Sequence, residues 1–413
     1  MNRTIHMAFM KRIGRLHVLI TVILISIVLP TVFALAASRT SVSLQSNGRI
    51  VYKPGYTIYE EGSMYYAQIA NGNVAFSSTN AIPAINYAIG NLTNGGTVFL
   101  KAGTYSNDSS NQQINPHQIG NIVLEGENDA TIINSTSIIV GNNTVIRNLK
   151  CVGNPQDAAI YVSAYYTGRE NITVQNVDCD SLNTTKSFFV YIGNTTVQNL
   201  KFIDCKTVNG TGYGWIFETA PPNVGTIKDV WLTRCQAINC GRYGNSTDWV
   251  GGFDFENLHL IQNVFLTDCL AAGCWREGFH FEFAPIKSNI ILSGCLAEDD
   301  GQVGRGTGSP NVVWYDFGFL LSSGTTAVNC ISQNCSGAGF YYKDTQVGDI
   351  LTISNCTDYG SYISLLSEIY AGGTAMIDHF YSYNAIYQPI YRVAPGASDV
   401  LTNIFVNGQP YTP

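Results

Sequence analysis

The sequence predicts an all-β solenoid, in which short strands recur along the chain and stack coil upon coil. Eight cysteines recur at intervals of 28, 26, 30, 34, 26, 35 and 26 residues. Five of the eight follow an apolar-x-apolar-x-x frame, as in the segment from Val230 to Cys235. The composition, with 45% hydrophobic residues, 12% charged residues and 40 glycines, suits short strands joined by many turns. The eight are Cys151, Cys179, Cys205, Cys235, Cys269, Cys295, Cys330 and Cys356.

The repeat length explains why the coils stack. A unit of about 30 residues cannot bury its own apolar face, so neighbouring units cover it and form one elongated domain. Strand alternation sends each cysteine and its apolar partners inward. After Cys356 the next rung has Phe380 at the cysteine position, and Val400 to Phe405 forms the last rung. We expect about nine or ten coils.

A short helix and a glycine-flanked strand precede the repeats. Thr79 or Asn80 can cap a helix with Pro83 in its first turn, and Ile82, Ile85, Ala88 and Ile89 then share one face. The strand that follows reads Gly-Gly-Thr-Val-Phe-Leu-Lys-Ala-Gly-Thr-Tyr over residues 95–105. A short helix followed by this glycine-flanked strand resembles the N-terminal cap of the pectate-lyase-like superfamily, although Lys101 stands where proline is common.

That resemblance implies a right-handed parallel β-helix over residues 78–413, with an N-terminal capping helix. Residues 38–77 are expected to form a small β cap in front of it. The superfamily hosts many activities, so fold membership alone does not choose a function.

Residues 1–37 have the pattern of an export signal. A basic start precedes an apolar run from Val18 to Ala36, which ends in the small-residue site Ala34-Leu35-Ala36. We expect cleavage. The alternative is an N-terminal membrane anchor, because a run of roughly 20 apolar residues can span a bilayer. The predicted location is secreted or at the extracellular surface.

The charge argues against nucleic acid as a partner. Removing the four basic residues of 1–37 takes the formal charge from −7 to −11. Membrane contact is then expected only through an uncleaved N-terminal segment. Eleven Asn-x-Ser/Thr sites after residue 37 are typical of an exported glycoprotein.

The cysteines are interpreted as packing groups. Rungs ~4.8 Å apart would permit disulfides, but side chains in register point the same way and a buried thiol packs as a small hydrophobe. A ladder of reduced thiols is therefore expected. Cys240, Cys274 and Cys335, each five residues after a ladder cysteine, are the better candidates for disulfide partners.

A second strand recurs in the frame Gly-aromatic-x-aromatic-x, first at residues 214–218 and last at residues 339–343. Its aromatic residues are expected inside and its x positions outside, in two columns. The first predicted column is Ile216, Asp254, His280, Gly318 and Tyr341. The second is Glu218, Glu256, Glu282, Leu320 and Lys343.

The acidic part of these columns is the predicted catalytic site. It comprises Glu218, Asp254, Glu256, His280 and Glu282. Stacking would place Glu256 and Glu282 ~5 Å apart, near the separation in retaining glycosidases, and Asp254 and Glu256 ~6.6 Å apart, near the inverting range. The same spacing also fits a Ca²⁺ site with oxygen ligands. No metal ligand is assigned, and no cofactor other than this Ca²⁺ is expected.

Side chains suited to sugar rings accompany the columns. We assign substrate binding to Trp249, Trp275, Arg276, Tyr341 and Lys343, because aromatic planes and polar forks match carbohydrate surfaces. The structural alternative is an acidic face that only keeps a rigid rod in solution.

Comparison with polygalacturonase-like members of the superfamily narrows the activity. Of their Asn-Thr-Asp, Asp-Asp, Gly-His-Gly and Arg-Ile-Lys motifs, only Asp299-Asp300 is present, and His280 lies between Phe279 and Phe281. Polyuronate lyases need cations, but only Arg276 and Lys343 are basic near the columns. These departures favour a neutral glycan.

The sequence therefore favours an exported, carbohydrate-active β-helix, a hydrolase or lyase acting on a polysaccharide or surface glycan. The alternative is a non-catalytic surface β-helix, such as an adhesin, envelope protein or glycan- or Ca²⁺-binding protein. Whether the chain is an enzyme stays open at this point.

Overall fold

The computed structural model describes residues 41–44, 50–53, 55–107, 112–241, 250–281, 284–302, 316–344, 350–369, 374–392 and 398–411. Contacts divide the chain into two units, residues 1–54 and 55–413. In the first, β1 (Ser41–Leu44) pairs antiparallel with β2 (Ile50–Lys53). The predicted signal or anchor, residues 1–37, lies outside the described residues.

No helix within the described ranges combines the length and the apolar character needed to cross a membrane.

The second unit begins with an antiparallel meander of β3 (Tyr56–Glu61), β4 (Met64–Ile69) and β5 (Val74–Ser78). Because β3 also pairs parallel with β6 (Gly96–Leu100), the meander continues the sheet of the coils. The expected helix is α2 (Ala81–Gly90), and the Asn80 side chain accepts a 3.0 Å hydrogen bond from the Ile82 amide. α2 packs its apolar face against β4 and β5.

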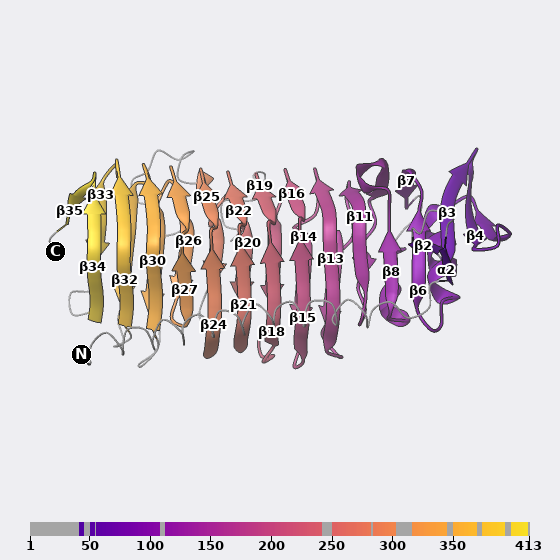
Figure 1. Cartoon of the computed structure of the whole chain (residues 1–413), viewed down its shortest axis with the longest axis horizontal. Helices are drawn as coiled ribbons and strands as arrows, with labels where there is room; N and C mark the ends of the chain where they lie inside the picture. Colours follow the sequence, from indigo (N-terminus) through magenta and orange to yellow (C-terminus); the bar gives the residue numbers. More distant parts are fainter. Residues whose placement is uncertain are drawn as a thin grey trace, which may run out of the picture. The chain divides into compact units, whose positions relative to one another are not determined.

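The coils themselves are built from parallel strands in register, which confirms the predicted all-β parallel architecture (Figure 1). In the described part of the chain, ten strands form one sheet, called here the ten-stranded sheet. They are β10 (Ile138–Ile139), β12 (Ile160–Ala164), β14 (Lys186–Ile192), β17 (Tyr213–Glu218), β20 (Phe253–Glu256), β23 (Phe279–Phe281), β26 (Phe317–Ser322), β29 (Ala338–Asp344), β31 (Ile363–Ile369) and β33 (Gln388–Arg392).

The remaining strands wind around the other sides of the coils. They are β7 (Gly103–Ser106), β8 (Ile122–Glu125), β9 (Thr131–Asn134), β11 (Val145–Val152), β13 (Arg169–Asp180), β15 (Thr196–Ile203), β16 (Lys206–Val208), β18 (Thr226–Thr233), β19 (Gln236–Ile238), β21 (Leu260–Thr267), β22 (Leu270–Ala272), β24 (Ile286–Ser293), β25 (Leu296–Glu298), β27 (Thr325–Val328), β28 (Ile331–Gln333), β30 (Ile350–Tyr359), β32 (Thr374–Tyr383), β34 (Ser398–Val406) and β35 (Gln409–Pro410). Two 3₁₀ turns, Pro116–Gln118 and Asn128–Ala130, complete the elements.

A bend precedes most ladder cysteines. The residue before the cysteine has a left-handed backbone, with φ of 52° at Arg234, 53° at Asp268 and 54° at Asn329. Asn and Asp tolerate this conformation better than other residues with a β-carbon, and the chain turns there into the next side of the coil. The same bend occurs at His379, and Phe380 pairs in register with Cys356 as predicted.

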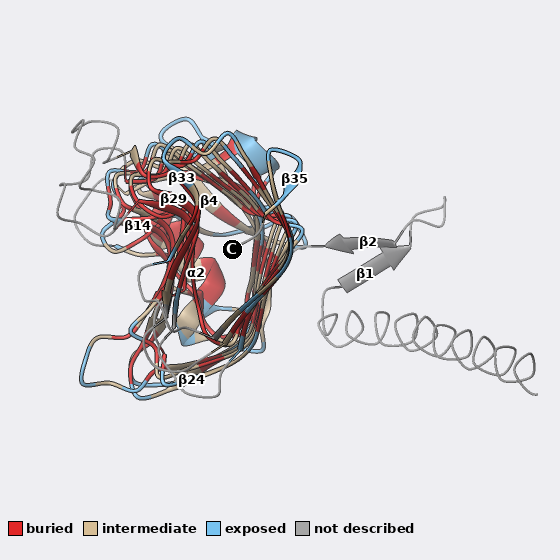
Figure 2. Ribbon diagram, turned by 90° about the vertical axis from the view of Figure 1, so that its left-hand side faces the viewer, coloured by how far each residue is buried: buried red, intermediate tan, exposed pale blue. Residues whose placement is uncertain are grey.

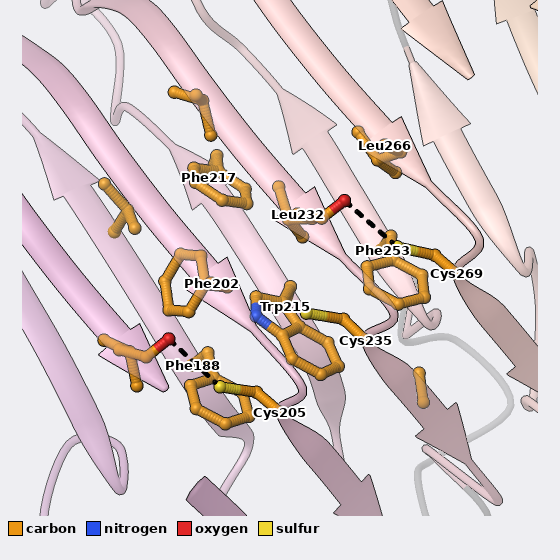
Figure 3. Packing of buried hydrophobic residues seen from close by; sticks show 14 of the residues in the cluster. Phe188, Phe202, Cys205, Trp215, Phe217, Leu232, Cys235, Phe253, Leu266 and Cys269 are labelled. Atoms are coloured by element: carbon orange, nitrogen blue, oxygen red, sulfur yellow. Dashed lines mark hydrogen bonds between the residues drawn. The ribbon is translucent and has the colours of Figure 1, made fainter. Parts of the chain in front are cut away.

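The interior of the coils is a continuous apolar core. Seen from the side turned by 90°, the buried residues line the inside of the coils (Figure 2). Aromatic rings of successive coils stack on one another, with centroids 4.4 Å apart for Phe188 and Trp215 and 4.7 Å apart for Trp215 and Phe253. Figure 3 shows these rings beside the thiols of Cys205, Cys235 and Cys269.

All eleven cysteines are free and buried, as expected for a ladder of reduced thiols, and Cys240, Cys274 and Cys335, the candidates for disulfide partners, form no disulfide. Their thiols are instead held by the core: the thiol of Cys274 donates to the Ala237 carbonyl at 3.6 Å, and that of Cys335 donates to the Ala297 carbonyl at 3.9 Å. Burial raises the pKa of the Cys335 thiol well above its usual range. These sulfurs are packing groups.

Candidate functional site

The outer face of the ten-stranded sheet brings the predicted columns together. Strand register pairs Ile216 with Asp254 and Asp254 with His280, and it pairs Glu218 with Glu256. We call Ile216, Asp254, His280, Leu320 and Tyr341 the first row, and Glu218, Glu256, Ser322 and Lys343 the second row. The predicted stacking of Asp254 on His280 is therefore confirmed.

The rows differ from the prediction at β26. His280 pairs with Leu320 and Phe279 with Phe319, so Leu320 belongs to the first row and Gly318 to neither. The prediction aligned the chain on Phe317 and Phe319. In the structure, Gly318 takes the place that Gly278 has in the preceding coil. A β-carbon at Gly318 would approach the Cys335 sulfur to 2.9 Å. A side chain there would collide with the core.

The first row is buried, whereas the sequence predicted an exposed column. Asp254 and His280 are each 1% exposed. Alternation gives the direction of a side chain relative to its own sheet, but it does not say what covers that sheet. Glu218 and Glu256 of the second row are half-buried, so the second row is the more accessible side of the site.

A buried contact between a carboxyl group and an imidazole forms the centre of the first row. The Nδ1 atom of His280 lies 3.2 Å from Oδ1 of Asp254. β20 and β23 are adjacent parallel strands, so the backbone itself holds the two side chains side by side. A protonated imidazole at this distance favours the ionised form of the Asp254 carboxyl group.

Glu277 is a further buried carboxyl group beside this pair. It is 1% exposed, and its Oε1 atom has no hydrogen-bond partner within the described residues. Burial raises the pKa of Glu277 to about 7, with the charge of His280 lowering it and the charge of Asp254 raising it. A carboxyl group near neutrality next to this pair can exchange protons at ordinary pH.

Backbone hydrogen bonds hold the segment that carries Glu277. The amide of Trp275 donates to the Cys240 carbonyl at 2.8 Å, and the Gly301 amide donates to the Arg276 carbonyl at 2.8 Å. The Glu277 carbonyl accepts from the Gly252 amide at 2.9 Å. This segment is thus tied to the coils on both sides. Arg276 is buried with Glu277, while Trp275 is half-buried.

Tyr213 and Lys186 border the acidic residues at the N-terminal side. Burial and the charges of Asp254, Glu256, Glu218 and Glu277 raise the pKa of the Tyr213 hydroxyl, so it stays protonated and can donate a hydrogen bond. The ammonium group of Lys186 lies 3.0 Å from Glu218. The Lys186 ammonium group therefore balances the Glu218 carboxylate.

Two predicted substrate-binding residues lie at the C-terminal side. Tyr341 is buried, and its hydroxyl donates to the Glu368 carboxylate. It packs with Phe317, Leu320 and Leu366 in a separate apolar cluster. Lys343 is exposed and pairs in register with Glu368. Both sit two or three strands away from the Asp254–His280 pair.

Two other predicted site residues, Trp249 and Glu282, lie outside the described residues. The Asp299-Asp300 pair does not form a carboxylate pair facing the site. Asp299 is a turn residue with φ of 55°, and Asp300 is buried in the core, where its Oδ1 accepts from the Cys274 amide at 2.8 Å. The resemblance of this pair to a catalytic Asp-Asp motif is therefore limited to the sequence.

Across the described ranges, no group of three or more His, Cys, Asp or Glu side chains is arranged to hold a metal ion.

Glu277 and Tyr213 are the site residues that the catalytic prediction missed. The signal available in the sequence was the position of Glu277 directly before the Gly-Phe-His-Phe frame, in the same place as Gly251 one coil earlier.

Comparisons with known proteins identify the fold. No protein-family model matches the chain, and no curated protein matches it. Among solved structures, the catalytic domain of a GH87 α-1,3-glucanase in complex with nigerose matches with a TM-score of 0.50 and 13% identity. The match covers 80% of this chain and 63% of that domain, so this chain spans less than two thirds of its length.

Two further structures match more loosely. An open reading frame 18 protein of Geobacillus virus E2 has a TM-score of 0.48 and 15% identity, covering 84% of this chain and 68% of that one. The A-module of the Azotobacter vinelandii mannuronan C-5 epimerase AlgE4 has a TM-score of 0.39 and 12% identity, covering 80% and 93%. With the strand topology, the glucanase match confirms the fold predicted from the pectate-lyase-like motif: the chain is a right-handed parallel β-helix.

Proposed function

We propose that this protein is a glycoside hydrolase that cleaves a neutral polysaccharide at the Asp254–His280–Glu277 cluster. The observation that carries the proposal is the contrast between two neighbouring carboxyl groups. Glu277 has a pKa of about 7 because it is buried, while Asp254 lies 3.2 Å from His280. A carboxyl group that holds its proton near neutral pH, beside a second carboxyl group paired with a histidine, is an arrangement that acid–base cleavage of a glycosidic bond can use.

Glu277 acts as the general acid in this proposal. Its protonated form gives a proton to the oxygen of the leaving sugar as the bond between that oxygen and the anomeric carbon breaks. Asp254 acts as the base that takes a proton from the attacking water, whose oxygen bonds to the anomeric carbon. His280 keeps Asp254 ionised, and Tyr213 donates a hydrogen bond within the site.

The neutral substrate follows from the charges around the cluster. Glu218 and Glu256 border its accessible side, and Lys186 pairs with Glu218. A uronate chain would bring further carboxylates against them, which like-charge repulsion disfavours. The α-1,3-glucanase with a similar fold is bound to nigerose, a neutral sugar, and supports this choice of substrate class.

The test is a degradation screen with the protein and its Glu277→Gln and Asp254→Asn variants. The substrates are soluble α- and β-linked glucans, with polygalacturonate and alginate as anionic chains. We expect new reducing ends from a neutral glucan with the wild type and none above background with either variant. Unsaturated products absorbing in the ultraviolet would instead indicate a lyase, and binding without cleavage would indicate the non-catalytic alternative.

Export is a second part of the proposal. The basic and apolar pattern of residues 1–37 and the acidic remainder of the chain favour a secreted or surface location. Mass spectrometry of the native protein tests it. A mature N-terminus after Ala36 is expected, and peptides from residues 1–35 would instead indicate a retained anchor.

A further inference from the structure

A patch of aromatic side chains lies on the outer face of the ten-stranded sheet, N-terminal to the acidic cluster. We call Tyr161, Tyr165, Tyr166, Phe189 and Tyr191 the tyrosine patch. The rings of Tyr161 and Phe189 stack at 5.0 Å, those of Tyr165 and Tyr191 at 5.5 Å, and Phe189 contacts Tyr191 at 5.4 Å. The rings therefore form one continuous surface.

This surface is open to solvent. Tyr166 is 90% exposed, and its ring stands edge-on to that of Tyr165 at 4.6 Å. Tyr161, Tyr165 and Tyr191 are half-buried, and only Phe189 is covered. Tyr161 and Tyr191 pack with one side against a small apolar cluster of Ala158, Phe189 and Ile216 on the outside of the coils. Their other sides remain partly exposed, and a contiguous patch of such rings marks a binding surface.

The patch continues directly into the candidate site. Along one row, Tyr161 pairs with Phe189, Phe189 with Ile216, and Ile216 with Asp254. Along the other, Tyr191 pairs with Glu218, and Glu218 with Glu256. The second of these rows is the accessible one, because Tyr191, Glu218 and Glu256 are half-buried. Tyr191 and Glu256 are two strand spacings apart, or ~10 Å. A ligand touching both must be an extended chain lying along the axis of the coils.

The charges around the patch select the kind of chain. The ammonium group of Lys186 lies 3.8 Å from the centre of the Phe189 ring and 3.0 Å from Glu218. It thus already forms a cation–π contact and an ion pair within the protein. Glu218 and Glu256 then face the same side as the rings. Aromatic faces with hydroxyl groups suit sugar rings, while the two carboxylates disfavour an anionic polymer.

We propose that the tyrosine patch binds the sugar rings of an uncharged polysaccharide whose chain runs along the coils toward the Asp254–His280 pair. This inference rests on the proposed function, since it supplies the remote binding surface of the same site. Binding energy from rings far from the cleaved bond holds the chain in place for the reaction.

The experiment measures affinity as a function of chain length. Neutral gluco-oligosaccharides from disaccharide to hexasaccharide are titrated by calorimetry into the full chain carrying Glu277→Gln, and oligogalacturonates of the same lengths serve as anionic probes. We expect the affinity to rise with length for the neutral series only. Adding Tyr161→Ala and Tyr191→Ala should lower hexasaccharide affinity by about 100-fold, about tenfold per ring, and leave the disaccharide unaffected.

The chain offers a matched control. Tyr359 and Tyr383 stack at 5.2 Å on the outside of β30 and β32, away from the ten-stranded sheet. Their double alanine variant should leave every affinity unchanged. Tyr166→Ala, at the most exposed ring, serves as a second variant that carries little risk to folding, and Tyr161→Phe with Tyr191→Phe should retain most of the affinity.

The inference is overturned if no neutral oligosaccharide binds, if affinity does not depend on length, or if the control pair has the same effect as the patch. Its failure is distinguishable from that of the proposed function. Tyrosine-dependent binding in a protein that cleaves no glycan supports the patch and contradicts the hydrolase. Cleavage of polymers at the same rate with and without the tyrosines supports the hydrolase and contradicts the patch.

Discussion

Two buried carboxyl groups in different coils have opposite hydrogen-bonding environments. Asp358, near the C-terminal end, accepts hydrogen bonds from the hydroxyls of Ser332, Ser361 and Ser364, the last two at 2.5 and 2.6 Å. Ser364 in turn contacts the Ser382 hydroxyl at 2.7 Å. Both oxygens of Asp358 are thus satisfied by residues of its own and neighbouring coils.

Glu277, in the middle coils, lacks such donors. One of its oxygens has no hydrogen-bond partner within the described residues, and the titratable groups near it include Asp254 and His280. Burying a polar group without a partner costs free energy that packing must offset.

The difference separates a structural carboxyl group from a functional one. Where a buried acid serves only the fold, hydroxyl donors surround it, as they do at Asp358. Where an acid must be able to release and regain its proton, donors that would fix its charge state are absent. Local inconsistencies of this kind are expected at functional sites.

The largest expected effect is the loss of turnover in Glu277→Gln. Glutamine keeps the shape of the side chain but cannot donate a proton, so kcat should fall by about 10²–10⁴-fold. Asp358→Asn, the matched change in the structural carboxyl group, should leave kcat within about twofold. Steady-state kinetics on the glucan found in the screen measures both. Equal losses of kcat in the two variants would contradict the assignment of Glu277 as a functional and Asp358 as a structural carboxyl group.

The same Glu277→Gln change should alter the dependence of stability on pH. The pKa of Glu277 is raised from 4.5 to about 7 in the folded state, so between these values the folded protein binds more protons than the unfolded chain. Stability is therefore lost as pH rises through this window. Above pH ~7 the cost is on the order of 3 kcal/mol, and below pH ~4.5 it vanishes.

Glu277→Gln should accordingly be more stable than the wild type at alkaline pH and equal to it at acid pH. Urea unfolding at several pH values measures the difference. A constant difference across the whole range would show that the pKa of Glu277 is ordinary.

An intermediate effect is expected at Asp358. Asp358→Ala leaves three buried hydroxyls without their acceptor, which should lower the free energy of unfolding by about 1–3 kcal/mol. Asp358→Asn keeps one acceptor oxygen and should cost less. Chemical denaturation measures both variants, and an alanine variant as stable as the wild type would mean that the serine cluster is not a network.

The repeated elements could be predicted from the sequence because each is set by its own residues. Cys151 pairs with Cys179 in register, Cys356 with Phe380, and Asp254 with His280, all as spacing and alternation indicated. Parallel stacking makes one coil a template for the next, so a pattern seen in several coils fixes the rows.

The rest depended on contacts between segments that do not repeat. Glu277 lies in the link between β22 and β23, whose path follows hydrogen bonds to Cys240, Val250 and Gly301 rather than strand alternation. The burial of Asp254 and His280 likewise depends on what covers the sheet. At β26 two phenylalanines gave a plausible but wrong alignment, because the close approach that requires Gly318 is visible only in three dimensions.

The smallest effect is expected in the thiol ladder, whose cysteines lie in or beside strands outside the ten-stranded sheet that carries the acidic cluster. Cys235→Ala removes one buried sulfur and should lower the free energy of unfolding by about 1 kcal/mol, without changing kcat. Intact mass with and without reductant should be identical, because the thiols are free. An added mass of two hydrogens per bridge on reduction would show that ladder neighbours can pair, and the coils would then be held by covalent links as well as by packing.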